Sequence, residues 1–514
     1  MSENVSRRLI TTIIVSGLGT LIGYAISFFI TPFITTNLGI DAYSFVTMAN
    51  TAVMYAGVIT IALTSFVVRY IVLAYHKGEI EEARSYYSSS IVASIALSGI
   101  LFGIAAILIS QLQNLLIIPE LLVNSVKLLF LLVFLNFVVT TITTPFTATF
   151  YVRNRLDINA FVRLTAKIIE ATGVFLLFFL CPTKLWYVAI GAIAGSTVII
   201  VVSIFLTKKL TPELAFKRHD VSFSKMVTLF KNGIWNSMNQ LGNVLNSGLD
   251  LIVANRMLSS IETGQIAVGK TVGSYFSVLI QLVSQPFEPI LLKSYASGDI
   301  VDFQKHMSKA MKFCGFFGAM AFAGFCGVGL NFFHLWLPNE DHYVLYVLTV
   351  LTVVTCVTDS ILRPVYYIST LTVKNKIPCI ITIVGGVLNV LSMYLLIKYT
   401  NLGVYTVAIT TIVIMFLINL VFNPLYAAHC IKINSWFFYK ILIVHLIASA
   451  VMAGSLFGLN YLMSTSSWLT LVLEGLLFVL IGTIIYFLIV FNIDEKRAII
   501  GKIKRVFIKE KIQE

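Results

Sequence analysis

Residues 232–250 read NGIWNSMNQLGNVLNSGLD, a polar stretch in a chain that is otherwise mostly apolar. On an α-helix, at about 100° per residue, its polar side chains share an arc of about 120°. The arc holds Asn232, Asn236, Asn239, Gln240, Asn243, Asn246, Ser247 and Asp250. Amides are costly in hydrocarbon unless they are paired or hydrated, so we expect this face to look into a helix bundle or a wet cavity. The alternative is an interfacial helix with its polar face in water.

The composition predicts an all-α polytopic membrane protein. Of the 514 residues, 58% are hydrophobic and 11% are charged, whereas a soluble protein carries about 25% charged residues. The net charge of +13 comes from short loops and a tail, which does not favour a nucleic-acid partner. The six cysteines are scattered without metal-ligand spacing. Since no nucleotide-binding loop or catalytic constellation is visible, we expect neither an enzyme nor a metal site.

A bilayer-spanning helix needs about 20 mostly apolar residues. The sequence predicts fourteen such spans: 9–36, 42–70, 86–110, 121–150, 159–180, 185–207, 228–255, 263–292, 310–333, 343–370, 377–398, 403–428, 437–461 and 467–491. With the N-terminus in the cytoplasm, 29 of the 36 Lys and Arg residues fall on the cytoplasmic side, four fall outside and three lie within helices. This asymmetry follows the positive-inside rule and places both termini in the cytoplasm.

Two pairs of loops indicate an internal repeat. The loop 75–80, YHKGEI, matches the loop 295–300, YASGDI, at an offset of 220, and VRNR at 152–155 matches VKNK at 373–376 at an offset of 221. Six helices per copy make the repeat parallel, so two lobes facing each other would enclose a central cavity. We therefore expect an N-lobe at 1–220, a C-lobe at 221–430, two extra helices at 431–493 and a basic tail at 494–514. The offset also pairs the first predicted span, 9–36, with the amide-bearing span 228–255. We expect these two helices to face each other across the cavity.

This pattern resembles the multidrug/oligosaccharidyl-lipid/polysaccharide (MOP) exporter superfamily, in particular the Wzx-type polysaccharide flippases. The resemblance covers essentially the whole chain. It is carried by the twelve-helix core, the two extra helices, Arg69 ahead of the loop 75–80, and the sequences Thr31-Pro32-Phe33 and Asn37-Leu38-Gly39 at the end of the first helix.

The resemblance implies alternating access by rocking lobes. The expected substrate is an undecaprenyl-(pyro)phosphate-linked oligosaccharide, moved from the inner to the outer leaflet of the bacterial cytoplasmic membrane for surface polysaccharide synthesis. Its partners would be this lipid-linked substrate, the bilayer and a polysaccharide polymerase. A teichoic-acid or peptidoglycan precursor is an alternative substrate. A drug/cation antiporter is a further alternative, but residues 9–36 of the first helix lack the acids that the drug-exporting branch typically carries there.

Three cations lie within predicted helices, and an ionisable group in a membrane is a functional candidate. Lys270 lies near mid-membrane, where it could capture a pyrophosphate or pair with Asp250 or another acid. Arg363 has Asp359 one turn earlier, a spacing that also permits a local ion pair. Arg69 could bind an anionic lipid headgroup that enters from the cytoplasmic side, or its side chain could simply extend to the membrane interface.

The predicted substrate-binding residues are Arg69, Lys270, Arg363, Asn236, Asn239, Gln240 and Asn243. The predicted ion-coupling residues are Asp250, Glu288 and Asp359. Glu288 is placed between Pro286 and Pro289, where a helix break could free carbonyl groups for an ion. No cofactor is expected, and coupling to Na⁺ or H⁺ stays open.

Overall fold

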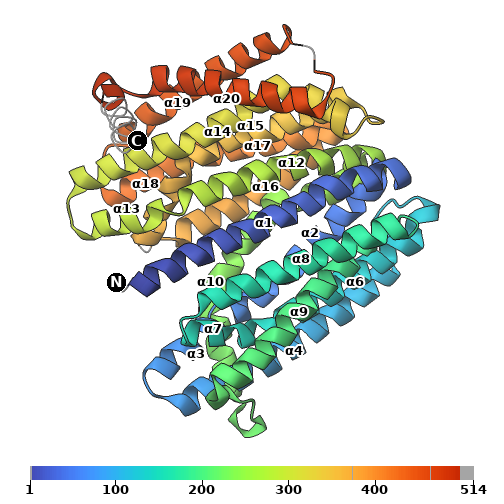
Figure 1. The fold of residues 1–514 in the computed structure, drawn as a ribbon, viewed down its shortest axis with the longest axis vertical. Coiled ribbons are helices and arrows are strands. Elements are labelled where there is room, and N and C mark those ends of the chain that lie inside the picture. Colours follow the sequence, from blue (N-terminus) through green and yellow to red (C-terminus); the bar gives the residue numbers. More distant parts are fainter. Residues whose placement is uncertain (1–2, 373, 464, 498–514) are drawn as a thin grey trace, which may run out of the picture. The chain divides into compact units, whose positions relative to one another are not determined.

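The computed structural model describes residues 3–372, 374–463 and 465–497, and this part of the chain is helical without strands (Figure 1). The first half forms α1 (Glu3–Leu38), α2 (Ile40–Thr64), α3 (Val67–His76), α4 (Ile80–Ser110), α5 (Leu112–Leu115), α6 (Val123–Thr143), α7 (Ala148–Val152), α8 (Leu156–Leu180) and α9 (Tyr187–Leu210). The second half forms α10 (Phe223–Ser247), α11 (Leu249–Met257), α12 (Ser260–Ser284), α13 (Phe287–Ala296), α14 (Ile300–Trp336), α15 (His342–Leu371), α16 (Lys376–Tyr399), α17 (Tyr405–Phe416), α18 (Asn423–Ile431), α19 (Trp436–Asn460) and α20 (Trp468–Val490). Short 3₁₀ segments are η1 (Glu120–Leu122), η2 (Thr144–Thr147), η3 (Pro212–Leu214) and η4 (Arg218–Asp220), and the π-helical segment η5 (Leu417–Phe422) joins α17 to α18.

The protein is an all-α polytopic membrane protein. Within the described residues, twelve helical stretches are long and apolar enough to cross a membrane. The predicted count of fourteen spans is not confirmed. The two predicted spans that do not qualify are 159–180 and 228–255. The first lies in α8, which carries Arg163, Lys167 and Glu170, and the second lies in α10 and α11, which carry the amides.

The helix boundaries around the first loop pair, 75–80 and 295–300, repeat as predicted. Helices α2, α3 and the start of α4 recur as α12, α13 and the start of α14, and every boundary is displaced by 220 residues. The turn before α4 has Gly78 at φ 83°, and the turn before α14 has Gly298 at φ 75°. A side chain is strained in this left-handed region, which explains the glycine in both loops.

The chain divides into two compact units. Unit 1 is Met1–Ala267 with Thr382–Val407, and unit 2 is Val268–Ile381 with Ala408–Glu514. Unit 1 thus includes α10, α11 and most of α16 from the second copy of the repeat. The two units are defined by which residues lie close together in space, whereas the predicted lobes are defined by the sequence repeat. The lobe boundaries at 220, 430 and 493 therefore stay predictions. The predicted tail at 494–514 lies largely outside the described residues.

In unit 1, α10 packs against α2, and α1 packs against α8 (Figure 1). Gly233 brings the first pair together, because a Cβ atom there would lie 1.9 Å from the carbonyl oxygen of Ala62. One turn later, the Ser237 hydroxyl donates a hydrogen bond to the carbonyl of Val58 at 2.5 Å. These contacts fix one side of α10 against α2, and α16 covers the far side near Gly242, where a Cβ atom would lie 2.9 Å from the Thr382 side chain.

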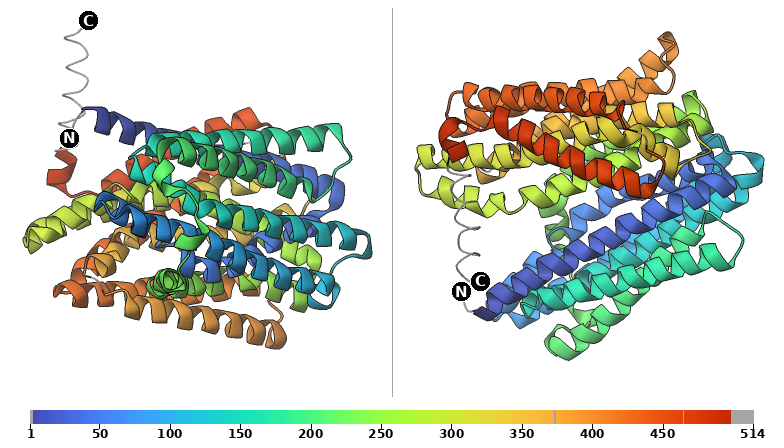
Figure 2. Two further views of the ribbon diagram at one scale, coloured as in Figure 1. Left: turned by 90° about the horizontal axis from the view of Figure 1, so that it is seen from below. Right: turned by 45° about the horizontal axis from the view of Figure 1, so that its top comes forward.

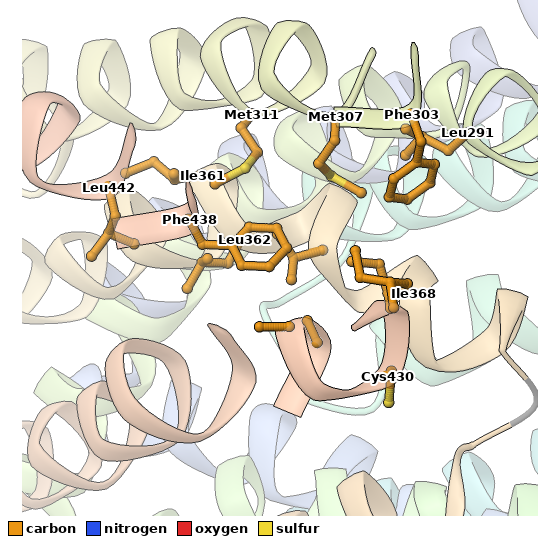
Figure 3. Packing of buried hydrophobic residues seen from close by; sticks show 14 of the residues in the cluster. Leu291, Phe303, Met307, Met311, Ile361, Leu362, Ile368, Cys430, Phe438 and Leu442 are labelled. Carbon is orange, nitrogen blue, oxygen red and sulfur yellow. The ribbon is translucent and has the colours of Figure 1, made fainter. Parts of the chain in front are cut away.

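In unit 2, a buried cluster joins α13, α14, α15, α18 and α19 (Figure 3). Met307 and Met311 of α14 face Leu362 of α15 and Phe438 of α19 within it. A second cluster joins α14 to α19 and α20, which lie side by side (Figure 2). Phe478 of α20 fills the space at Gly327 of α14, where a Cβ atom would lie 2.4 Å from its ring. The extra C-terminal helices are thereby packed onto the second copy of the repeat.

Candidate functional site

Helix α10 of unit 1 carries a run of exposed amide side chains. Asn232, Asn236, Asn239 and Asn243 are exposed, and Gln240 is half-buried. The contacts of Gly233 and Ser237 with α2 lie on a neighbouring side of the helix, and the amide side chains remain accessible at the surface of unit 1. We name Asn232, Asn236, Asn239, Gln240 and Asn243 the amide face.

The predicted eight-residue arc is not a continuous exposed face, because Asn246 and Asp250 are packed inside unit 1; the side chain of Ser247 lies outside the described part of the structure. Asn246 is 2% exposed and Asp250 is 5% exposed. The Asn246 Nδ2 atom donates hydrogen bonds to the carbonyls of Gly242 at 3.0 Å and Thr382 at 2.8 Å. Helix α10 ends at Ser247, and α11 begins at Leu249. The approach of α16 to this turn, rather than the helical period, decides which amides are covered.

Buried polar atoms surround the turn that carries Asp250. The Asn389 Nδ2 atom of α16 donates to the backbone carbonyl of Asn246 at 3.1 Å. The side-chain oxygen of Asn246 is buried and accepts no hydrogen bond from a described residue. An Asp250 oxygen accepts from the backbone N–H of Leu251 at 2.9 Å. Oxygen atoms of this kind suit a hard cation, which makes this turn the best-supported of the predicted ion-coupling positions.

Arg69 lies on α3 beside the start of the amide face. Its side chain is exposed, and its guanidinium carbon lies 5.6 Å from the centre of the Phe66 ring. The next residue, Tyr70, accepts a hydrogen bond from the Asn232 amide at 2.9 Å. The structure therefore places Arg69 one residue from a direct contact with α10. Tyr70 is a neighbour that the sequence did not single out.

A loop with its own ion pair fixes the start of α10. Arg84 of α4 pairs with Asp220 of η4, and the Ser85 hydroxyl donates to the carbonyl of Asp220 at 2.9 Å. The hydrogen bond from Arg84 lowers the pKa of the Asp220 carboxyl, and the charge of Arg84 acts in the same direction. The backbone N–H of Ser222 donates to the Ser89 hydroxyl at 2.8 Å. These contacts hold the entry to α10 against α4.

Arg363 belongs to a polar cluster in unit 2. Its Nη2 atom lies 3.4 Å from an Asp359 oxygen, so the predicted pair one turn apart is present. The Tyr366 hydroxyl lies 3.2 Å from Asp359 and 2.9 Å from the side-chain oxygen of Asn419. Asn423 donates to the same Asn419 oxygen at 3.1 Å.

The surroundings of this cluster distinguish it from a simple ion pair. Asn419 lies in η5, and π-helical turns inside α-helices are frequent at functional sites. The Nε atom of Arg363 is buried and donates no hydrogen bond to a described residue. Arg363 therefore keeps hydrogen-bonding capacity for an anion. The spacing of Asn419 and Asn423 within an apolar span could have revealed the amide partners of Tyr366 in this cluster from the sequence.

Lys270 and Glu288 lie elsewhere in unit 2. Lys270 is half-buried in α12, and Glu288 is exposed in the first turn of α13. The helix does break near the two prolines, between Ser284 and Phe287. In this position, the negative charge of Glu288 interacts favourably with the positive N-terminal end of the α13 dipole. Within the described residues, no cluster of three or more His, Cys, Asp or Glu could hold a metal ion.

No family model matches the chain. It is 28% identical over 488 residues, 94% of this chain and 96% of the relative, to the uncharacterized membrane protein EpsK of Bacillus subtilis. A MATE family multidrug resistance transporter of the MOP superfamily, solved facing inward, superimposes with a TM-score of 0.65 at 14% identity, covering 82% of this chain and 99% of that one. The lipid II flippase MurJ, in an inward closed conformation, superimposes with a TM-score of 0.63 at 16% identity, covering 92% and 99%. The chain thus has the fold of MOP superfamily transporters.

Proposed function

We propose that the protein is a flippase for an oligosaccharide linked to undecaprenyl (pyro)phosphate. It moves this lipid from the inner to the outer leaflet of the bacterial cytoplasmic membrane by alternating access. Both termini lie in the cytoplasm, as the distribution of Lys and Arg predicts. The observation that carries the proposal is the exposed amide face of α10 in a chain with the MOP transporter fold.

The amide face suits the glycan part of such a substrate. Sugar hydroxyls both donate and accept hydrogen bonds, and each Asn or Gln side chain offers two donors and an accepting oxygen. Four exposed amides along α10, at positions 232, 236, 239 and 243, would offer such groups over about 16 Å at 1.5 Å per residue. A surface of this kind binds many hydroxyl arrangements, which fits an oligosaccharide better than a small hydrophobic cation.

Arg69, Lys270 and Arg363 are proposed to receive the phosphate groups. A guanidinium can donate two parallel hydrogen bonds to a phosphate, and an ammonium binds it as a point charge. Arg363 supports this role best, because its Nε atom is buried without an acceptor in the described structure. Asp250 is proposed to couple transport to Na⁺ or H⁺, because it is a buried acid one helical turn after Asn246, whose side-chain oxygen is also buried and accepts no hydrogen bond from a described residue.

Two alternatives compete with this proposal. A peptidoglycan or teichoic-acid precursor is favoured by the structural similarity to the lipid II flippase. Against the peptidoglycan precursor stands the apolar core that Met452, Phe478 and Tyr486 form where α19 and α20 meet α14, where such a flippase is expected to have a deep groove. A drug/cation antiporter is favoured by the similarity to the multidrug transporter, but α1 has no acid beyond Glu3.

Inactivation of the protein in its native cell tests the proposal. We expect one lipid-linked oligosaccharide to accumulate in the inner leaflet and the corresponding surface polysaccharide to disappear. Accumulation of a peptidoglycan precursor would favour the first alternative. Unchanged lipid-linked glycans together with increased sensitivity to cationic drugs would favour the second.

A further inference from the structure

Unit 1 contains an apolar groove that the proposed function does not use. It has a volume of about 560 Å³ and lies between α10–α11 and α16. Leu249 and Val253 line one wall, and Val387 and Leu391 line the other. Val387 is 53% exposed and Leu391 is 51% exposed, so the groove is open to the outside of the protein.

The walls of the groove are almost wholly apolar, and Arg256 and Tyr394 are its only lining residues whose side chains carry a nitrogen or oxygen atom. Arg256 is exposed in the last turn of α11, and no described carboxylate forms an ion pair with it. A groove of this composition fits an amphiphile with a long apolar chain and one anionic group. The guanidinium recognises a phosphate through paired hydrogen bonds.

The dimensions match one leaflet of a bilayer. The lining residues on the α10–α11 side run from Leu245 to Met257, and the eleven steps of rise from Leu245 to Arg256 span about 16 Å of helix. Half of a hydrocarbon core is about 15 Å. Arg256 is also one of the four Lys and Arg residues that the predicted topology places on the outer side. The cation therefore falls at the level of the outer headgroups, and the apolar walls extend from it to the middle of the membrane.

We propose that this groove binds the tail of a polyprenyl phosphate in the outer leaflet, with the phosphate on Arg256. The inference rests on the proposed function, for which it supplies the exit position of the lipid. A single groove between two helices accepts one chain, which fits a polyprenyl lipid better than a two-chain phospholipid. The amide face lies on the turns of α10 that precede the groove. Along the chain, a hydrogen-bonding surface on α10 is therefore followed directly by an apolar surface on the end of α10 and on α11.

Photolabelling of the full chain in phosphatidylcholine liposomes tests the inference. The probe is undecaprenyl phosphate that carries a diazirine in its tail, and the labelled peptides are identified by mass spectrometry. We expect labelling of residues 245–257 and 387–394. Arg256→Gln should lower it about tenfold, since a lost hydrogen bond to a charged group costs about one order of magnitude in affinity. Val387→Trp should also lower it, because the added bulk obstructs the groove.

Two variants serve as matched controls. Lys184→Gln removes another exposed cation from the predicted outer side, and Leu480→Trp adds the same bulk at a 63% exposed position on α20. Both should leave labelling unchanged. Equal labelling by a phosphatidylglycerol diazirine, labelling confined to other helices, or an Arg256→Gln variant that labels normally would overturn the inference. Because labelling needs no transport, a negative result here leaves the export phenotype of the inactivated cell intact, and the two proposals fail separately.

Discussion

The side-chain amide of Asn232 donates a hydrogen bond to the Tyr70 hydroxyl at 2.9 Å. This contact joins the first residue of the amide face to α3, one residue after Arg69. The amide face and Arg69, which we propose to bind the glycan and the phosphate, are thus linked through Tyr70 within unit 1.

The amide face should be needed for export but not for folding. We expect Asn236→Ala combined with Asn239→Ala to lower export about tenfold or more, because several hydrogen bonds to the glycan are lost. Thermal stability should stay within about 0.5 kcal/mol, since both side chains are exposed. Export is measured by complementation of the inactivated cell. Met238→Ala, an exposed position on another side of α10, is the control; an equal loss of export in this variant would contradict the role of the amides.

Lys270→Ala and Arg363→Ala should each abolish export while membrane insertion stays intact. The reason is the loss of a cation for the lipid phosphate. Arg363→Lys should restore part of the activity, because an ammonium keeps the charge and loses the paired hydrogen bonds. Lys293→Ala, at an exposed position on α13, is the control. Normal surface glycan in both alanine variants would argue against a cationic binding site, though not against the fold.

Asp250→Asn should uncouple transport from an ion gradient. The amide keeps the shape of the side chain and removes its charge, so a bound Na⁺ or H⁺ would be lost. We expect initial transport rates in proteoliposomes to become independent of the imposed gradient. Glu81→Gln, at an exposed position in the first turn of α4, should keep the gradient dependence of the unmodified protein. If Asp250→Asn responds to the gradient as before, the coupling ion binds elsewhere.

Gly233→Ala should destabilise the contact between α10 and α2. The new Cβ atom would lie 1.9 Å from the Ala62 carbonyl oxygen, and such overpacking typically costs about 1–3 kcal/mol. Gly57→Ala, where nothing lies within 4 Å of the added atom, is the matched control on α2. Thermal unfolding in detergent measures both variants. Equal melting temperatures would contradict the close approach of these helices.

The loop before α10 should loosen in acid. Arg84 lowers the pKa of Asp220 below its ordinary value of 3.8. A carboxyl of this kind stabilises the folded state fully above its unfolded pKa, and this contribution disappears as the pH falls through the lowered folded pKa. Limited proteolysis of residues 208–222 should therefore accelerate below about pH 4. Asp220→Asn should show the faster cleavage already at pH 7; cleavage independent of pH in the unmodified protein would contradict this account.

The sequence predicted those features that depend on local pattern. The repeat was visible in two loops because Gly78 and Gly298 are required at equivalent turns with positive φ. The amide face was visible because Asn232, Asn236 and Asn243 follow the helical period. These features need no knowledge of which helices pack together.

Features that depend on packing could not be predicted. Asn246 and Asp250 follow the same helical period but are buried, because α16 approaches closely where Gly386 lacks a side chain. The cluster of Tyr366 with Asn419 depends on the π-helical turn of η5. The predicted count of fourteen spans relied on length and hydropathy, and the charges of α8 and the amides of α10 leave it unconfirmed.

The most direct measurement uses the full-length protein in liposomes with the lipid-linked oligosaccharide recovered from inactivated cells. An added glycosidase reports how much of the lipid reaches the outer leaflet. The account predicts that nearly all of the lipid becomes accessible with the unmodified protein, and that the Asn236→Ala, Asn239→Ala variant transfers it about tenfold more slowly. Accessibility that stays at the level of protein-free liposomes, or is identical for the unmodified protein and the variant, would contradict the central claim.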